Sequence, residues 1–496
     1  MKKKLIYAMM LTSALFVGCN DEFLEGEQTN VLTASGIAEY SGDYPALLDG
    51  SLNGITSLII EPRGTLGTAA NRHNDFGQKG IDIWLDLICG DMALSGSAYG
   101  WYNNSANLVS TVDYTMYEND LTWKYYYRII SIANSVIESA GGNDAQPESD
   151  DAKRILGQAK IYRAYAYFYL LQLYQGAYDP NQEVLPFFNV DIYSLEKVPA
   201  GDVYAQVVED LTSAIELLEN YSRTLKSQVD KTVAQGFLAY TYAAMGNYVD
   251  AKIQADNVIE SGYPMTTAGQ LAFPGAGSGF NDVNTASWIW GYDLVEDLGH
   301  QLIDWWGQID CFTYSYAWAG DYKSIDNLLY SQIPEGDVRK TQFGTGTATL
   351  QPINKFFDPA RTIGGQYIIS TDLVHMRVDE FYLLSAEAAA KSSNEPAAKA
   401  MMIDFLTPRV GAAEASSMIT PLSGQSLRNE IYLQTRIEMW GEGKSYLAMK
   451  RNQATVTRGS NHVYRAGESF AYDSDEMTFQ IPQSEIDNNP SITGQN

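Results

Sequence analysis

Apolar side chains recur at the spacing of an α-helix in three regions of the chain, residues 121–140, 151–175 and 202–248. A helix turns once in about 3.6 residues, so positions three and four apart share a face. The first two regions place these apolar residues on one face: Tyr125, Ile129, Ile132, Ala133, Val136 and Ile137, then Ile155, Ala159, Tyr162, Ala166 and Leu170. The third region is interrupted near residues 220–231. The pattern therefore predicts four long helices.

A short turn over Gly246–Ala251 closes the last of these helices and opens another, which Pro264 ends. A Gly-x-Tyr-x-x-Ala turn with small residues on both sides is typical of a tetratricopeptide unit, in which two helices approach closely. A similar alanine-rich pair recurs at residues 379–391 and 396–406. The repeats are degenerate, so they predict a helical scaffold and not a regular solenoid.

Helical periodicity disappears between Thr266 and Asp372, where Gly, Ser, Thr, Trp and Tyr are dense. Trp288, Trp290 and Tyr292 alternate there, which predicts a strand with their common face buried. Two irregular aromatic segments, residues 95–108 and 298–326, read as long loops. Long loops in a helical protein are usually functional, so these two are candidates for a binding site.

The first eighteen residues have the pattern of a secretory signal: three lysines, an apolar stretch of about 13 residues from Leu5 to Val17, then Gly18-Cys19. A spanning helix would need about 20 residues. A small residue directly before Cys at this point indicates a bacterial lipoprotein, with Cys19 acylated as the mature N-terminus. Phe16 departs from the leucine that is usual there. Residues 19–36 are polar and predict a tether, and no later segment is apolar enough to span a bilayer.

Charge narrows the class of partner. The chain carries 33 Lys+Arg against 60 Asp+Glu, a net charge of -27, which becomes -30 once the three lysines of the signal are removed. Nucleic acid and anionic lipid both need a basic surface, so neither is expected as a partner. Lipid chains at Cys19 would hold the protein to the membrane. Three cysteines exclude a disulfide scaffold, and four scattered histidines leave little for a metal site.

Two blocks of the C-terminal part stand out: residues 377–388 (RVDEFYLLSAEA), and residues 434–444 (QTRIEMWGEGK), closed by Lys450-Arg451. They resemble the SusD/RagB family of nutrient-uptake lipoproteins, the first its helix that ends in Ala-Glu-Ala and the second its Glu-Arg-Arg-x-Glu-Leu-x-x-Glu-Gly block. Residues 159–168, Phe23-Leu24-Glu25 after the lipobox, and the Phe479–Pro482 terminus with Asn489-Pro490 also match. Gln434 and Thr435 stand where the family has an acid and an arginine, which puts a local ion pair in doubt.

The resemblance implies a mainly α fold, with four tetratricopeptide-like helix pairs and an irregular, loop-rich ligand-binding region. It divides the chain into a signal peptide (1–18), a tether (19–36), an N-terminal helical region (37–265), an aromatic insertion (266–372) and a C-terminal region (373–496). It also implies an outer-membrane lipoprotein, facing outside, that binds oligosaccharide without cleaving it. Its partner would be a SusC-like TonB-dependent barrel, over which it closes as a lid.

Sugar rings present flat C–H faces that pack on Trp and Tyr, while amides bind hydroxyls. We therefore predict that Trp101, placed where family members often have a binding Trp, stacks on a sugar and that Asn103 or Asn104 binds its hydroxyls. The other candidates come from the same two loops: Tyr102, Trp305, Trp306, Tyr314 and Trp318. Trp288 and Trp290 are assigned to the core. Because the chain is acidic, the ligand is expected to be neutral.

Other chemistry receives weaker support. Two rival functions remain open: peptide uptake of the RagB type, and a glycoside hydrolase, although no acid such as Asp91, Glu296 or Asp297 is marked out as catalytic. A protein-binding scaffold is a third. No cofactor or metal is predicted; the acidic loop 142–151 reads as a solvated turn with calcium as an alternative. Arg72–Asp75 reads as a surface loop, Cys89 as a buried apolar residue, and a Cys89–Cys311 disulfide is a minor alternative.

Overall fold

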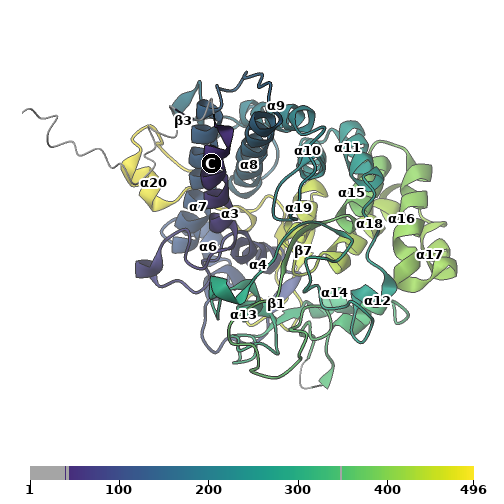
Figure 1. The fold of residues 1–496 in the computed structure, drawn as a ribbon. Coiled ribbons are helices and arrows are strands. Elements are labelled where there is room, and N and C mark those ends of the chain that lie inside the picture. The colour runs from purple at the N-terminus through teal and green to yellow at the C-terminus, as the bar shows by residue number, and fades with distance from the viewer. Residues whose placement is uncertain (1–39, 41–43, 347–348) are drawn as a thin grey trace, which may run out of the picture.

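The predicted helices form one side of the molecule. The computed structural model describes residues 40, 44–346 and 349–496, so the signal peptide, Cys19 and the tether lie outside the described residues. Each helix of the array packs against the next along the chain, across the upper part of Figure 1, and the loop-rich part lies below it. The array consists of α7 (Tyr117–Ser139), α8 (Asp150–Tyr174), α9 (Ala200–Leu217), α10 (Lys231–Ala244), α11 (Tyr248–Glu260), α15 (Asp379–Lys391) and α16 (Glu395–Val410).

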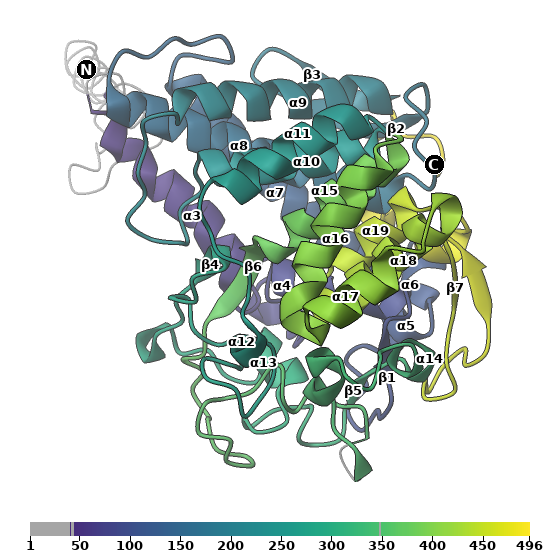
Figure 2. The same cartoon turned by 90° about the vertical axis from the view of Figure 1, so that its right-hand side faces the viewer.

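Shorter elements complete the fold. Figure 2 shows α3 leading from the helical array towards the loop-rich part. The N-terminal and C-terminal helices are η2 (Pro45–Leu48), α3 (Asp49–Ile60), η3 (Thr68–Ala70), α4 (Gln78–Ile88), α5 (Asn103–Ala106), α6 (Val109–Val112), α17 (Ala412–Ile419), α18 (Gly424–Glu438), α19 (Lys444–Arg451), η7 (Asp475–Met477) and α20 (Gln483–Asn488). The middle of the chain contributes α12 (Ala268–Leu271), η4 (Glu296–Leu298), α13 (Trp305–Ile309), α14 (Asn327–Ser331) and η5 (Val338–Gln342).

Helix α8 is the central member of the array. Its first turn is capped by Ser149, whose hydroxyl accepts from the backbone N–H of Ala152 at 3.2 Å. Every residue from Ile155 to Tyr174 is buried, because α7 and α9 cover its sides. Gly157 allows the close approach of α9, since a Cβ there would lie 2.8 Å from Leu218. Helix α8 is therefore buried on every side, beyond the single face that its apolar pattern marks, and the charged residues Lys160 and Arg163 are buried with it.

The helix predictions are confirmed with small shifts at the ends. The first helix begins at Tyr117 rather than near Leu121, and the interruption near 220–231 is the connection between α9 and α10. At the Gly-x-Tyr turn, Gly246 has a φ of 77°, which glycine adopts without strain. The Asn247 side chain then caps α11.

The described strands form four antiparallel pairs, each of two short strands. They are β1 (Met92–Leu94) with β5 (Lys323–Ile325), β2 (Glu183–Phe188) with β3 (Tyr193–Pro199), β4 (Trp288–Tyr292) with β6 (Leu373–Arg377), and β7 (Thr455–Thr457) with β8 (Ser469–Ala471). The predicted strand at Trp288–Tyr292 is confirmed, and its five residues are all buried. Trp288 and Trp290 therefore belong to the core, as expected.

A buried ionic network joins β6, α16 and α18. The Glu438 carboxylate accepts from Arg377 at 2.8 Å, from Arg409 at 2.8 and 2.9 Å, and from Arg339 at 3.1 Å. Burial alone would raise the pKa of Glu438, but the three guanidinium groups outweigh it and hold that pKa well below its usual range. Gln434, where the family has an acid, accepts a hydrogen bond from Arg339. At this position the charged guanidinium of Arg339 is therefore bonded to a neutral amide.

Neither described cysteine forms a disulfide. Cys89 is buried, as predicted, and Cys311 is half-buried with its thiol 2.8 Å from the Gln351 side-chain oxygen. Within the described ranges, no helix combines the length and apolar character that a membrane crossing needs.

Candidate ligand-binding site

The two aromatic loops singled out in the sequence lie side by side in the structure. Strands β1 and β5 are far apart in the sequence but pair in the structure. Their pairing brings residues 95–108 against residues 310–322. The backbone N–H of Ser95 donates to Tyr322 at 2.8 Å, and that of Tyr99 donates to the Asp321 carboxylate at 2.7 Å. The loops therefore form a single surface.

Aromatic rings gather on this surface, which we call the aromatic platform: Tyr99, Trp101, Tyr314, Tyr316, Trp318 and Tyr367. Tyr316 meets Tyr99 edge-on at 5.2 Å and Trp101 at 6.1 Å between ring centroids. Tyr314 contacts Trp318 at 5.6 Å and Tyr367 at 5.0 Å. Tyr99, Trp318 and Tyr367 are 61%, 42% and 53% exposed. Large apolar groups gathered at the surface in this way mark an interaction site.

A third loop, residues 61–75, supplies polar groups at the edge of the platform. The His73 ring stacks on Trp101, with centroids 4.5 Å apart and planes 10° apart, and one ring nitrogen contacts the Tyr316 hydroxyl. Arg63 lies 3.0 Å from the other ring nitrogen. Burial, together with the Arg63 guanidinium, lowers the pKa of His73. A neutral imidazole therefore covers one face of Trp101 at neutral pH.

This loop corrects an interpretation of the sequence. Arg72–Asp75 was predicted to be a surface loop, but Asn74 and Asp75 are buried. Asn74 donates to the backbone oxygen of Trp101 at 2.9 Å, and the Asp75 carboxylate accepts from the N–H of Leu66 at 2.8 Å. These polar side chains are buried because they hold the loop against the platform. Arg63, Tyr99, His73, Tyr316 and Tyr367 were not among the predicted site residues.

The predicted site residues divide into two groups. Trp101, Tyr314 and Trp318 belong to the platform. Tyr102, Trp305 and Trp306 are at most 2% exposed, which argues against their predicted ligand contacts. The Lys323 ammonium covers the ring of Tyr102 at 5.0 Å, and the two indoles pack on each other at 5.0 Å.

Asn103 and Asn104 are half-buried and help to hold the first loop. The Asn103 side-chain oxygen accepts from the Ser97 hydroxyl at 2.6 Å. The Asn104 amide donates to Glu118 at 3.2 Å. Both asparagines therefore have one polar atom already engaged within the protein.

A buried polar chain fixes the platform from below. Lys323, only 1% exposed, donates to the Gln308 side-chain oxygen at 2.9 Å, and the Gln308 amide donates to the backbone oxygen of His73 at 3.2 Å. Burial lowers the pKa of Lys323 to about 8, although Asp321 opposes the shift. The chain links β5, α13 and the loop of residues 61–75, so it sets the relative position of the three segments.

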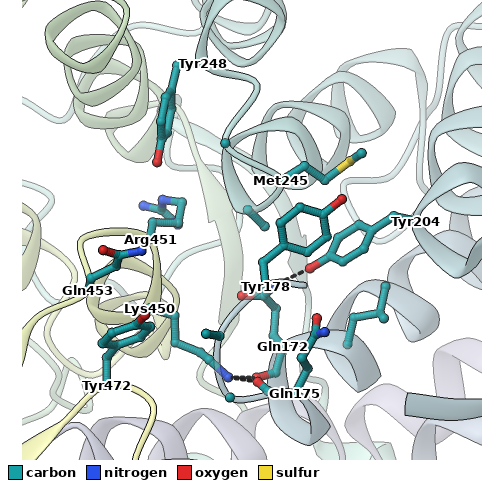
Figure 3. Close-up of a pocket in the computed structure, with 15 residues that line it drawn as sticks. Gln172, Gln175, Tyr178, Tyr204, Met245, Tyr248, Lys450, Arg451, Gln453 and Tyr472 are labelled. Carbon is teal, nitrogen blue, oxygen red and sulfur yellow. Dashed lines mark hydrogen bonds between the residues drawn. The ribbon is translucent and has the colours of Figure 1, made fainter. Parts of the chain in front are cut away.

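A separate cavity of about 170 Å³ lies in the helical half, between the end of α8, the turn between α10 and α11, and the end of α19 (Figure 3). Tyr178 and Tyr204 meet edge-on there at 5.1 Å, and the Gln172 amide donates to the Tyr204 hydroxyl at 2.8 Å. Lys450 donates to the Gln172 backbone oxygen at 2.6 Å, and Arg451 pairs with Glu387 at 3.0 Å. These polar groups are already bonded within the protein, and their bonds tie α8 to the neighbouring helices.

The acids considered for catalysis lie in two different environments. Asp91 is buried and pairs with Arg436 at 2.6 Å, which gives it a structural role. Glu296 and Asp297 are exposed on η4. Within the part of the chain that the structure describes, no group of three or more His, Cys, Asp or Glu side chains is arranged to hold a metal ion.

Comparison with known sequences gives two family matches. A model described as the SusD family matches residues 191–496, and one described as "Starch-binding associating with outer membrane" matches residues 76–243. A SusD-like protein of Bacteroides ovatus is 25% identical over 256 residues, which cover 50% of this chain and 40% of that relative. A SusD-like protein of Formosa agariphila is 25% identical over 243 residues, 46% of this chain and 42% of the relative. The match thus spans less than half the length of either relative.

Solved structures match over nearly the whole chain. A SusD-like carbohydrate binding protein from Bacteroides vulgatus superposes with a TM-score of 0.74 at 24% identity, covering 90% of this chain and 96% of that one. Surface glycan-binding protein A from Bacteroides fluxus superposes with a TM-score of 0.66 at 15% identity, covering 90% and 97%. At these identities the matches establish the fold.

Proposed function

The chain belongs to the SusD family, and on that basis we propose that it captures oligosaccharide at the cell surface and delivers it to a SusC-like TonB-dependent barrel as its lid. The observation that carries the proposal is the aromatic platform. Tyr99, Trp101 and Trp318 come from two loops that the fold brings together, with polar side chains such as Arg63 at their edge. Rings that offer flat apolar faces beside hydrogen-bonding groups suit a pyranose.

The proposed ligand is neutral and is bound without being cleaved. The net charge of -27 disfavours a polyanionic chain. The Asp321 carboxylate beside the platform accepts the N–H of Tyr99 at 2.7 Å and has 1% of its surface exposed, so it holds the loop in place and is poorly placed to act on a glycosidic bond.

A binding screen tests this function. Calorimetry measures the affinity of the full-length protein for three sets of ligands. These are neutral plant and bacterial oligosaccharides, their uronate-containing counterparts, and peptides of the same size. We expect micromolar to millimolar binding of at least one neutral oligosaccharide, with no shorter product after prolonged incubation. Binding confined to peptides would favour the RagB-type alternative, and product formation would favour a hydrolase.

A membrane experiment tests the proposed location and partner. When the protein is extracted from outer membranes in mild detergent, we expect it to co-purify with a TonB-dependent barrel of its host. We expect the variant Cys19→Ser to leave the membrane fraction, because the acylated thiol would be its anchor. Recovery of a lone monomer, or retention of Cys19→Ser in the membrane, would contradict the proposal.

A further inference from the structure

A groove runs along the outer side of α7, on the part of the helix that the rest of the array leaves uncovered. Two adjoining cavities of about 640 and 390 Å³ make it up, and both are lined by Tyr127, Ser131 and Phe188. The hairpin of β2 and β3 forms one wall, and residues at the end of α20 border the larger cavity. The α7 residues that line it extend from Trp123 to Glu138, about 22 Å at a rise of about 1.5 Å per residue.

Aromatic rings in unbroken contact line this groove. Trp123 lies 4.8 Å from Tyr127, Tyr127 lies 5.9 Å from Phe188, and Phe188 lies 4.8 Å from Tyr193, measured between ring centroids. Tyr193 at the far end is 79% exposed, and its neighbour Ile192 is 48% exposed. Trp123 at the other end is buried, so the apolar surface that stays open to water lies at the hairpin end, where it is a candidate contact for a partner.

Three of the four charged residues that line the groove, Lys124, Arg128 and Glu485, are paired or bonded within the protein, while Glu138 at one end is exposed. Lys124 pairs with Asp120 at 2.6 Å. Glu485 accepts from the Trp123 indole at 3.3 Å and from the Asn489 amide at 2.8 Å. The exposed polar groups on its walls include Ser131 and Asn488, which are short and neutral. Flat rings beside neutral hydrogen-bonding groups match an uncharged sugar chain better than a charged one.

The loop of residues 61–75 contributes both to the groove and to the edge of the aromatic platform. Thr65 lines the groove, and Arg63, two residues earlier, contacts His73 on the platform. Two residues span at most about 7 Å. Arg128 of α7 donates to the backbone oxygens of Gly64 and Thr65 at 2.9 and 3.0 Å, which fixes the junction. Thr65 itself is buried, so the groove and the platform are neighbours across this loop, and an oligosaccharide of several units would cross it to reach both.

We propose that the groove along α7 is a second binding stretch, occupied by the distal units of the same neutral oligosaccharide whose other end lies on the aromatic platform. The inference rests on the proposed function. It extends the binding surface from the loop-rich half onto the helical array. The groove then makes affinity depend on chain length, since a short saccharide fills only the platform.

The test compares short and long sugars on the detergent-solubilised full-length protein. Calorimetry is run with the trisaccharide and heptasaccharide of the malto, cello, xylo and manno series. In a series that binds, we expect the heptasaccharide to bind at least about tenfold more tightly than the trisaccharide, the size expected for one or two ring contacts. The variants Tyr193→Ala and Phe188→Ala should reduce heptasaccharide affinity to near that of the trisaccharide and leave the trisaccharide unchanged.

Controls separate the possible outcomes. Tyr44→Ala removes another exposed tyrosine, 65% exposed, that does not line the groove, and should leave both affinities unchanged. Tyr193→Ala removes a ring that is mostly in water, so it reports on binding even if Phe188→Ala unfolds the protein. If Tyr193→Ala binds the heptasaccharide as tightly as the wild type, the groove is not a binding stretch. Preferential binding of a peptide in the groove, or loss of trisaccharide binding in Tyr193→Ala, would also contradict the proposal. Failure of the wild type to bind any series would overturn the proposed function with it.

Discussion

Replacement of Glu438 by glutamine is expected to lower the free energy of unfolding by about 3–5 kcal/mol, the usual cost of breaking a buried ion pair from one side. The carboxylate is 2% exposed and accepts from Arg339, Arg377 and Arg409. An amide cannot balance these charges, and its NH2 group would point a donor at donors. Urea unfolding followed by circular dichroism measures the loss.

A surface pair provides the matched control for Glu438→Gln. Asp120 pairs with Lys124 on α7, and the lysine side chain is 49% exposed. Exposed ion pairs contribute about 0.2–1 kcal/mol, so Asp120→Asn should lower the free energy of unfolding by no more than about 1 kcal/mol. If Glu438→Gln costs no more than the control, the network does not stabilise the fold.

The pH dependence of stability gives a second readout of the same network. Burial opposes ionisation of Glu442, but Arg377 and Lys355 lower its pKa from an ordinary value of 4.5 to about 2. A carboxyl group with a lowered pKa in the folded state stabilises the protein above its ordinary pKa, and this contribution is lost as the pH falls through the folded value. The wild type should thus lose stability between pH 4.5 and pH 2. Glu438→Gln should lose less over this range, because one carboxylate is already gone.

Replacement of Trp101 by alanine is expected to weaken oligosaccharide binding at least about thirtyfold, or about 2 kcal/mol, which is the size of an aromatic hot spot. His73 covers one face of Trp101, so the sugar is expected on the opposite face. Calorimetry with the oligosaccharide found in the screen measures the change. Trp101→Phe keeps part of the ring and should recover part of the affinity.

Trp101 also supports its own loop, so folding must be measured alongside binding. The Asn74 amide bonds to the backbone oxygen of Trp101, which the substitution keeps, and the stack with His73 is lost. The thermal melting temperature of Trp101→Ala should therefore fall only slightly. Unchanged affinity in a folded Trp101→Ala variant would remove this residue from the site.

Periodicity predicted the helical half of the molecule well, because burial of a helix face depends on residues three and four apart. Tyr125 and Tyr165 show the principle: they lie on the facing sides of α7 and α8, and their hydroxyls meet at 3.1 Å. The pattern on each helix already marks the face that the other will cover. The sequence also located the two aromatic loops by their composition.

The exposure of individual rings in those loops could not be predicted, since it depends on residues far away in the chain. Trp305 and Trp318 come from the same aromatic segment, yet Phe356 packs against Trp305 at 4.6 Å while Trp318 remains 42% exposed. Composition treats the two indoles alike. Only the packing of the segment near residue 356 separates them.

The polar edge of the site left no periodic signal. Arg63 adopts a left-handed backbone with a φ of 58°, which a sequence pattern does not indicate for arginine. His73 was noticed only as part of a mixed polar run. Its role follows from the pairing of β1 with β5, which brings Tyr316 to it from more than 200 residues away along the chain.

The pairing of β1 with β5 also determines when the two halves of the platform meet during folding. Contacts between residues so distant in sequence form late, because the intervening chain must be ordered first. If the chain reaches the cell surface through a secretion pathway, its first loop arrives long before the residues that complete the platform. The helices, whose contacts are local, can assemble meanwhile. The aromatic platform would therefore be completed only after the helical array, in the last stage of folding.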